Sequence, residues 1–210
     1  MSAVPFAKAP LVSPGDQISL GITVRNLNNP WPGNLAQMRA FKVVVAGDGG
    51  VGKTTLIDAY KLGRFFEHKT TIGLNITVCM VDLGRGLMCK FVISDLSGQP
   101  RFMRIAREIP RIVRGADGAI LAFDLSSFTS LLVLKEWAEI IRKVNEDIPV
   151  ILVGTKADLE PEVNDEEIER LREELGAIKY IRTSSKLMLN VEEPFELLAR
   201  AIIARGRRPH

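Results

Sequence analysis

Residues 41–54 read FKVVVAGDGGVGKT, and this stretch decides the fold. Its first half, residues 41–46, is a short run of apolar and β-branched residues, which is typical of a strand buried on both faces of a sheet. Its second half places four glycines between positions 47 and 52, and then gives Lys53 and Thr54. We expect a buried strand that ends in a tight glycine turn and leads directly into a helix.

The glycine turn matches the phosphate-binding pattern of a glycine, any four residues and then Gly-Lys-Ser/Thr. Glycines let backbone N–H groups approach phosphate oxygens without obstruction by a Cβ atom, and the following helix N-terminus attracts anions. Lys53 is predicted to reach the β- and γ-phosphates, and the Thr54 hydroxyl can ligate magnesium. The alternative is a plain turn before an exposed lysine, and the position between strand and helix argues against it. The predicted nucleotide contacts in this loop are Asp48, Gly49, Gly50, Val51, Gly52, Lys53, Thr54 and Thr55.

After the turn, helix-period and strand-like segments mostly alternate, which predicts a parallel sheet covered by helices on both faces. The connection at 82–86, Asp-Leu-Gly-Arg-Gly, is too short for a crossover and must join antiparallel strands. The predicted fold is an α/β three-layer sandwich with a mostly parallel six-stranded sheet, one antiparallel hairpin strand and about five helices. Strands are expected at 41–46, 74–82, 87–94, 118–124, 148–154 and 179–182, and helices at 53–62, 102–113, 130–144, 165–175 and 192–204.

The chain divides into a main domain and two short flanking segments. Residues 1–40 contain five prolines and a strand-like stretch at 17–25, so this extension is either an ordered arm or partly disordered. The main domain is expected over 41–204. Residues 205–210, Arg-Gly-Arg-Arg-Pro-His, form a short basic tail.

Composition excludes several classes of protein. The net charge is +3 with 25% charged residues, and no polybasic footprint for a nucleic acid is present. No run reaches about 18 apolar residues, Ser2 replaces the glycine that myristoylation requires, and the end has no prenylatable cysteine. We expect a cytoplasmic protein without a transmembrane segment or lipid anchor, which could contact an anionic membrane through its basic tail. Cys79 and Cys89 lie in strand-like runs and are expected to be small buried hydrophobes.

Four further motifs follow in order along the chain. Residues 68–73 end in Thr-Ile-Gly, residues 95–99 read DLSGQ, residues 155–158 read TKAD, and residues 183–186 read TSSK. With the glycine turn, they resemble the motifs of the Ras-like small GTPases, most closely the Rab and Ras branches, over 41–204. The resemblance implies the P-loop NTPase fold, GTP and GDP as ligands, Mg²⁺ as cofactor, and a switch that hydrolyses GTP slowly.

The resemblance also assigns roles around the phosphates. Asp95 would hold magnesium through water, the Gly98 N–H would contact the γ-phosphate, and Gln99 would orient the attacking water. Thr71 would ligate magnesium with its hydroxyl and bond the γ-phosphate with its N–H, and the adjacent Thr70 is its competitor. The catalytic candidates are Gln99, Lys53 and Thr71, and the metal ligands are Thr54, Thr71 and Asp95.

The remaining motifs are implied to read the base. The Asp158 carboxylate can accept from guanine N1–H and the exocyclic N2 amine together, whereas adenine would leave it unpaired. Lys156 should lie along the base plane, and Thr155 stands where the family usually has asparagine. The main-chain N–H of Ser185 would meet the guanine carbonyl. The other base-site candidates are Ser184, Lys186 and the edge-packing aromatic Phe65, for which Phe66 is the alternative.

A slow intrinsic rate is expected because no arginine shortly precedes Thr71. His68 and Lys69 occupy that place, and the nearest arginine is Arg64. A partner arginine could then raise the rate by roughly 10³–10⁵. Protein effectors and regulators are expected at residues 64–73 and 99–109. The main alternative is a GTP-binding scaffold with negligible turnover; an ATP-using kinase is disfavoured by Asp158.

Overall fold

The computed structural model describes residues 38–66, 68, 73–96, 109–145 and 147–206. It contains a six-stranded sheet with the order β2-β3-β1-β4-β5-β6. Only the β2–β3 pair of this sheet is antiparallel, and the other neighbours are parallel. The predicted α/β fold class is therefore confirmed. The strands are β1 (Arg39–Ala46), β2 (Leu74–Asp82), β3 (Met88–Leu96), β4 (Gly118–Asp124), β5 (Val150–Thr155) and β6 (Lys179–Arg182).

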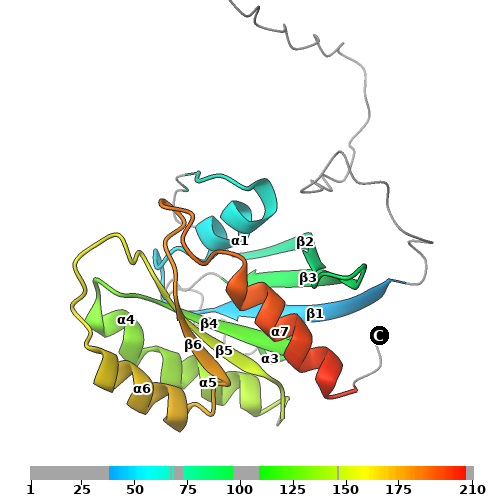
Figure 1. The fold of residues 1–210 in the computed structure, drawn as a ribbon. Helices are drawn as coiled ribbons and strands as arrows, with labels where there is room; N and C mark the ends of the chain where they lie inside the picture. The colour runs from blue at the N-terminus through cyan, green and yellow to red at the C-terminus, as the bar shows by residue number, and fades with distance from the viewer. Residues whose placement is uncertain (1–37, 67, 69–72, 97–108, 146, 207–210) are drawn as a thin grey trace, which may run out of the picture.

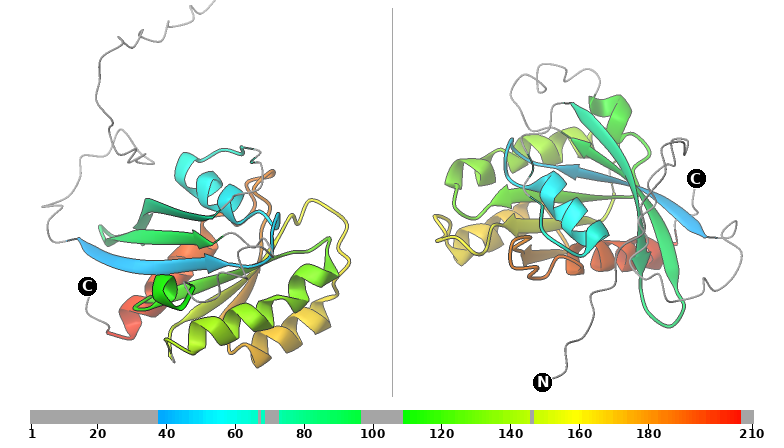
Figure 2. Two further views of the ribbon diagram at one scale, coloured as in Figure 1. Left: turned by 180° about the vertical axis from the view of Figure 1, so that it is seen from behind. Right: turned by 90° about the horizontal axis from the view of Figure 1, so that it is seen from above.

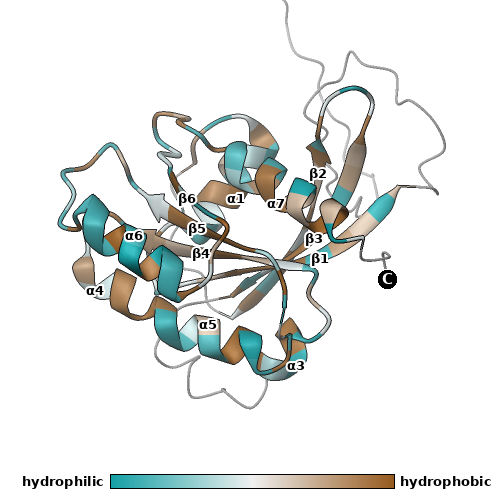
Figure 3. Ribbon diagram, turned by 60° about the horizontal axis from the view of Figure 1, so that its bottom comes forward, coloured by the Kyte–Doolittle hydropathy of each residue, from teal (hydrophilic) through white to brown (hydrophobic). Residues whose placement is uncertain are grey.

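Helices cover both faces of the sheet (Figures 1 and 2). Residues of α1 and α7 pack into one hydrophobic core, and residues of α3, α4, α5 and α6 pack into a second core on the opposite face. In Figure 3 the strands are mostly brown, whereas α6 carries teal segments on its outer turns. The helices are α1 (Lys53–Leu62), α3 (Ile109–Val113), α4 (Phe128–Leu132), α5 (Leu134–Arg142), α6 (Asp165–Glu174) and α7 (Glu193–Ala204).

The second half of the central strand β1 is apolar at every position because it is buried between the two cores. Val43 and Val45 point into the core beneath α1 and α7, while Val44 and Ala46 point into the opposite core. All four side chains are fully buried. A strand covered on both faces has no polar alternation, so a continuous β-branched run is the pattern it requires.

The predicted helix at 130–144 is divided between α4 and α5, with the break at Val133. The Ser130 hydroxyl lies 2.7 Å from the carbonyl oxygen of Ser127 and 3.2 Å from that of Asp124. These side-chain contacts tie the first turn of α4 to the end of β4.

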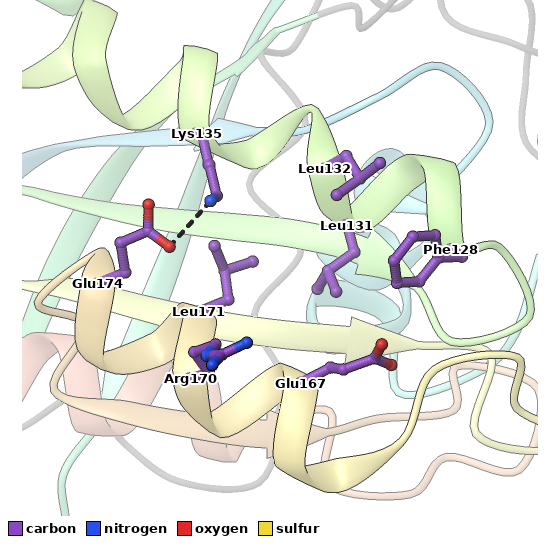
Figure 4. A pocket seen from close by; sticks show the side chains of 8 residues that line it. All are labelled: Phe128, Leu131, Leu132, Lys135, Glu167, Arg170, Leu171 and Glu174. Carbon is purple, nitrogen blue, oxygen red and sulfur yellow. Dashed lines mark ion pairs between the residues drawn. The ribbon is translucent and has the colours of Figure 1, made fainter.

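A groove lies between α4 and α6, on the outside of the second core (Figure 4). Leu131 and Leu171 are buried on its floor, and the rim carries an ion pair of 2.9 Å between Lys135 and Glu174. This ion pair connects the start of α5 to the end of α6. The lining residues are Phe128, Leu131, Leu132, Lys135, Glu167, Arg170, Leu171 and Glu174.

Candidate functional site

Four of the five predicted motifs begin at one edge of the sheet. Strands β1, β3, β4, β5 and β6 all run in the same direction, so their carboxyl ends lie at one edge, where ligands of α/β proteins bind. The glycine turn follows β1, DLSGQ begins within β3, TKAD begins with the last residue of β5, and TSSK follows β6. In Figure 1 the described loops lie around the start of α1, away from the β2–β3 turn.

The glycine turn needs glycine at its first position. Gly47 has φ 145°, and a Cβ atom there would lie 2.0 Å from the carbonyl oxygen of Ala122 on β4. Gly50 and Gly52 have φ 75° and 95°, in the left-handed region that L side chains disfavour. The chain then enters α1 at Lys53 directly after Gly52. This geometry gives the backbone the tight path that the sequence pattern predicts.

Lys53 folds back from the first turn of α1 over the glycine turn. Its ammonium donates hydrogen bonds to the carbonyl oxygens of Gly47 (3.0 Å) and Asp48 (2.6 Å). The residue is 6% exposed, and burial lowers the pKa of its ammonium to about 8, although the charges of Asp95 and Asp48 act in the opposite direction. Lys53 is thus a desolvated cation at a helix N-terminus, a position where an anionic phosphate would stabilise the charge.

Thr54 and Asp95 meet across the gap between α1 and β3. The Thr54 hydroxyl donates to Asp95 Oδ2 at 2.5 Å. Asp95 is 1% exposed, and its Oδ1 is buried without a hydrogen-bond partner among the described residues. Burial raises the pKa of this carboxyl, and the Thr54 hydroxyl and the Lys53 charge partly offset the increase.

These oxygens fit a magnesium ion. Mg²⁺ prefers hard oxygen ligands and completes its shell with water and phosphate oxygens. The orphaned Asp95 Oδ1 and the neighbouring Thr54 hydroxyl are donors of that kind. Within the described ranges, no group of three or more His, Cys, Asp and Glu side chains could hold a metal by itself. A cation here would depend on its other ligands, as a nucleotide-bound magnesium does.

Asp158, which follows β5, is held in place by two residues of the loop after β6. The Ser184 hydroxyl donates to Asp158 Oδ1 at 2.6 Å, and Lys186 Nζ lies 3.9 Å from Oδ2. The Asp158 side chain is only 12% exposed. TKAD and TSSK, which are 25 residues or more apart in the chain, therefore form one structure around a single carboxylate. Ser185 lies half-buried beside them.

The Thr155 hydroxyl connects the glycine turn to the sheet. Its oxygen lies 2.5 Å from the carbonyl oxygen of Val51 and 2.9 Å from that of Phe123. One hydroxyl proton must serve both carbonyls, since a hydroxyl is a single donor. Thr155 is buried, and its hydroxyl joins the TKAD motif to the glycine turn.

Asp124, the last residue of β4, is a member of this site that sequence reasoning missed. Its Oδ2 lies 2.5 Å from the ammonium of Lys156, whose backbone has φ 55°. That left-handed conformation costs a non-glycine residue about 1 kcal/mol. The one available signal was a lone aspartate that ends an otherwise apolar strand, and its partner could not be identified without the fold.

Segment 64–73 is described only in part. Phe65 is 40% exposed, while the Phe66 ring lies 4.5 Å from the guanidinium carbon of Arg64. The His68 Nε2 lies 2.9 Å from Asp58 Oδ2 on α1, so this part of the segment follows the helix. Both phenylalanines stay candidates for the base edge. Thr70, Thr71, Gly98, Gln99 and the range 99–108 lie outside the described residues.

Comparison with known proteins gives a consistent result. The sequence profile of the Ras family matches residues 42–204. The Ras-related protein Rab-19 of Homo sapiens is 34% identical over 170 residues, which cover 79% of this chain and 76% of Rab-19. The Ras-related protein Rab-13 of Bos taurus is 34% identical over 174 residues, with 80% and 83% covered. The Ras-related protein Rab-39A of Homo sapiens is 33% identical over 171 residues, with 77% of each chain covered.

The matched range includes all five motifs and every described strand beyond the first three residues of β1. The six-stranded mixed sheet, the glycine turn and this match over most of the chain agree: the chain belongs to the Ras family of small GTPases.

Proposed function

We propose that this chain is a molecular switch that binds GTP and GDP with Mg²⁺ and slowly hydrolyses GTP to GDP and phosphate. The observation that carries the proposal is the pairing of two features at one sheet edge. A buried Lys53 sits over the glycine turn, and the Asp158 carboxylate is held by Ser184 in a neighbouring loop. The first suits the phosphates of a nucleotide, and the second suits a base with two adjacent N–H donors.

Base selection would rest on Asp158. Its two oxygens would accept from guanine N1–H and from the N2 amine, while adenine has no such pair of donors. Binding adenine would then leave a mostly buried carboxylate without its partners, which is strongly unfavourable. The main-chain N–H of Ser185 would donate to the guanine carbonyl, and Phe65 or Phe66 would pack against the edge of the base.

The phosphates would lie along the glycine turn. The Lys53 ammonium would exchange its backbone carbonyl partners for phosphate oxygens, which restore the solvation that burial removes. Thr54, Thr71 and Asp95 would hold Mg²⁺, directly or through water. The bound ion would supply positive charge beside the phosphates.

Hydrolysis would be an in-line attack of water on the γ-phosphorus, with GDP as the leaving group. Gln99 would orient the water, and Lys53 would stabilise charge on the transferred group. Position 68, where a charged arginine would help, is a histidine that contacts Asp58. The intrinsic rate would therefore be slow, and a partner arginine would raise it by about 10³–10⁵.

Switching would follow from contacts of Thr71 and Gly98 with the γ-phosphate, which exist only in the GTP state. Segments 64–73 and 99–109 would present different surfaces in the two states, and effectors and regulators would read that difference. No helix in the described part of the chain is long and apolar enough to cross a membrane. We place the protein in the cytoplasm, where the short basic tail at 205–210 would bind an anionic membrane only weakly, at about 1 kcal/mol for each basic residue near the surface.

The test begins with nucleotide-free protein and fluorescent GDP, GTP and ATP, with and without magnesium. We expect both guanine nucleotides to bind more tightly than ATP, and magnesium to strengthen binding through Thr54 and Asp95. Single-turnover phosphate release should then be slow, and Gln99→Leu should reduce it at least about tenfold with little change in GTP affinity.

Two outcomes would contradict parts of this proposal. An unchanged rate in Gln99→Leu would remove Gln99 from the reaction. Tight GTP binding with no phosphate release over many hours would favour the alternative, a scaffold whose output is assembly with partners.

A further inference from the structure

A buried aspartate at the end of β4 pairs with the lysine of the TKAD motif. The Asp124 side chain is 10% exposed, and its two oxygens have separate partners. Oδ1 accepts from the backbone N–H of Ser126 at 2.9 Å and from the Ser126 hydroxyl at 2.7 Å. Oδ2 faces the Lys156 ammonium at 2.5 Å. Oδ1 is therefore occupied by two hydrogen bonds from Ser126, and Oδ2 is the oxygen that pairs with the Lys156 cation.

The backbone of Asp124 is held as firmly as its side chain. Its N–H donates to the Ser130 hydroxyl on α4 at 2.9 Å, and Asp124 pairs with Thr155 in the parallel β4–β5 ladder. If Lys156 were removed, the buried Asp124 carboxylate would be left without a counter-charge, which is strongly unfavourable. The pairing with Lys156 is favoured for this reason. Asp124 on β4 is thus a fixed ion-pair partner for Lys156, which directly follows Thr155 on the neighbouring strand β5.

Lys156 has the opposite character. Its backbone is in the left-handed region with φ 55°, and its side chain is 38% exposed. A long, exposed lysine normally samples many rotamers, and the contact with Asp124 limits that freedom. The same contact engages the ammonium with the Asp124 carboxylate, so that the aliphatic stem is the part that can cover an apolar surface.

We propose that Asp124 is a positioning residue for guanine-nucleotide binding, which acts through Lys156. This inference rests on the proposed function. Asp124 holds the Lys156 stem along the plane of the base and keeps the ammonium away from the phosphates. Base choice belongs to Asp158, whereas the Asp124–Lys156 pair determines how long the bound nucleotide remains.

This division predicts a specific signature. The loss of Asp124 should speed the release of every nucleotide that binds, and it should leave the ratio of GDP to ADP affinity unchanged. The loss of Asp158 should change that ratio. A general loosening of the site would alter both properties together.

The experiment is a double-mutant cycle on the dissociation rate of fluorescent GDP, with Asp124→Asn, Lys156→Met and the double variant. Asparagine still offers Ser126 a carbonyl oxygen but places an amide against Lys156. We expect each single variant to release GDP about tenfold faster, which corresponds to about 1.4 kcal/mol. The double variant should be no faster than either single variant, because both changes remove the same interaction.

Glu162→Gln is the matched control. Glu162 lies on the loop after TKAD and accepts from the Phe128 N–H at 3.4 Å, so the variant removes a carboxylate near β4 without touching Lys156. GDP release from this variant should equal that of the wild type. If Asp124→Asn does not fold, Ser126→Ala replaces it in the cycle, since it frees Oδ1 of its side-chain donor; an increase of about threefold is expected, and it should vanish in the Lys156→Met background.

Three results would overturn the inference. They are no acceleration in Asp124→Asn, an acceleration that adds fully to that of Lys156→Met, and a changed GDP to ADP ratio. The proposed function has its own indicator in the wild type. If the wild type prefers GDP to ADP but the variants give any of these three results, only the inference about Asp124 is refuted. If the wild type binds no purine nucleotide, the proposed function is refuted as well.

Discussion

The buried ammonium of Lys53 makes the stability of the nucleotide-free protein depend on pH in an unusual direction. Burial lowers the pKa of Lys53 from 10.5 to about 8 in the folded protein. Between these values the unfolded chain binds the proton and the folded chain does not. The free energy of unfolding therefore rises as the pH rises from about 8 towards 10.5, and below pH 8 this contribution is absent because Lys53 is charged in both states.

The size of the effect follows from the same shift. Each pH unit within the window contributes at most about 1.4 kcal/mol, so Lys53 should add about 2 kcal/mol between about pH 7.5 and about pH 9.5. Two other groups act oppositely. Burial raises the pKa of Cys79 and Cys89 to about 12, so their thiols ionise earlier in the unfolded chain and stability falls above about pH 9.

The contribution of Lys53 is isolated by comparison with Lys53→Met, which keeps the stem and removes the charge. Urea unfolding of both nucleotide-free proteins at several pH values gives the difference in their free energies of unfolding. That difference should shift by about 2 kcal/mol in favour of the wild type as the pH rises. Saturating GDP and magnesium should suppress the shift, because phosphates favour the ammonium. A constant difference across the pH range would refute the account of Lys53.

Three further experiments test the local geometry. Thr155→Val removes the hydroxyl that serves two buried carbonyl groups, so unfolding in urea should show a loss of about 1–3 kcal/mol, and Thr155→Ser should recover most of it. Gly47→Ala would put a Cβ atom 2.0 Å from the carbonyl oxygen of Ala122, and thermal unfolding should show a loss of about 3 kcal/mol or more. Cys79 and Cys89 are buried with raised pKa values, so Ellman's reagent should titrate both only after denaturation.

Controls for these changes come from the same loops. Gly50→Ala meets nothing within 4 Å, so it should lose only about 1 kcal/mol for its left-handed backbone. Equal losses in Gly47→Ala and Gly50→Ala would contradict the close approach to β4. Fast thiol reaction in the native protein would contradict the burial of the β2–β3 cysteines.

Much of the fold could be predicted because patterns in the chain report burial directly. Strands β2, β4 and β6 and helix α1 have the bounds expected from the sequence, since apolar runs and glycine turns mark their ends. Strand β1 begins at Arg39, two residues before its apolar run, because Arg39 and Ala40 pair with Cys89 and Lys90 on β3. Backbone pairing of this kind leaves no trace in hydrophobicity.

The candidate site shows the same limit. Lys53, Thr54 and Asp158 belong to motifs with fixed spacing, so the sequence alone nominates them as site residues. The pairing of Asp124 with Lys156 joins positions 32 residues apart on adjacent strands, and it depends on a register that only the fold supplies. A contact between residues on adjacent strands that share no motif cannot be predicted from the sequence alone.

The central claim is that Asp158 selects guanine for a nucleotide whose phosphates lie on the glycine turn. Calorimetric titration of wild type and Asp158→Asn with GDP, ADP and xanthosine diphosphate tests it most directly, because xanthine offers an acceptor where guanine has its N2 amine. Wild type should bind GDP at least about a hundredfold more tightly than ADP, and Asp158→Asn should prefer xanthosine diphosphate to GDP. Equal affinity of the wild type for GDP and ADP, or an unaltered preference in Asp158→Asn, would contradict it.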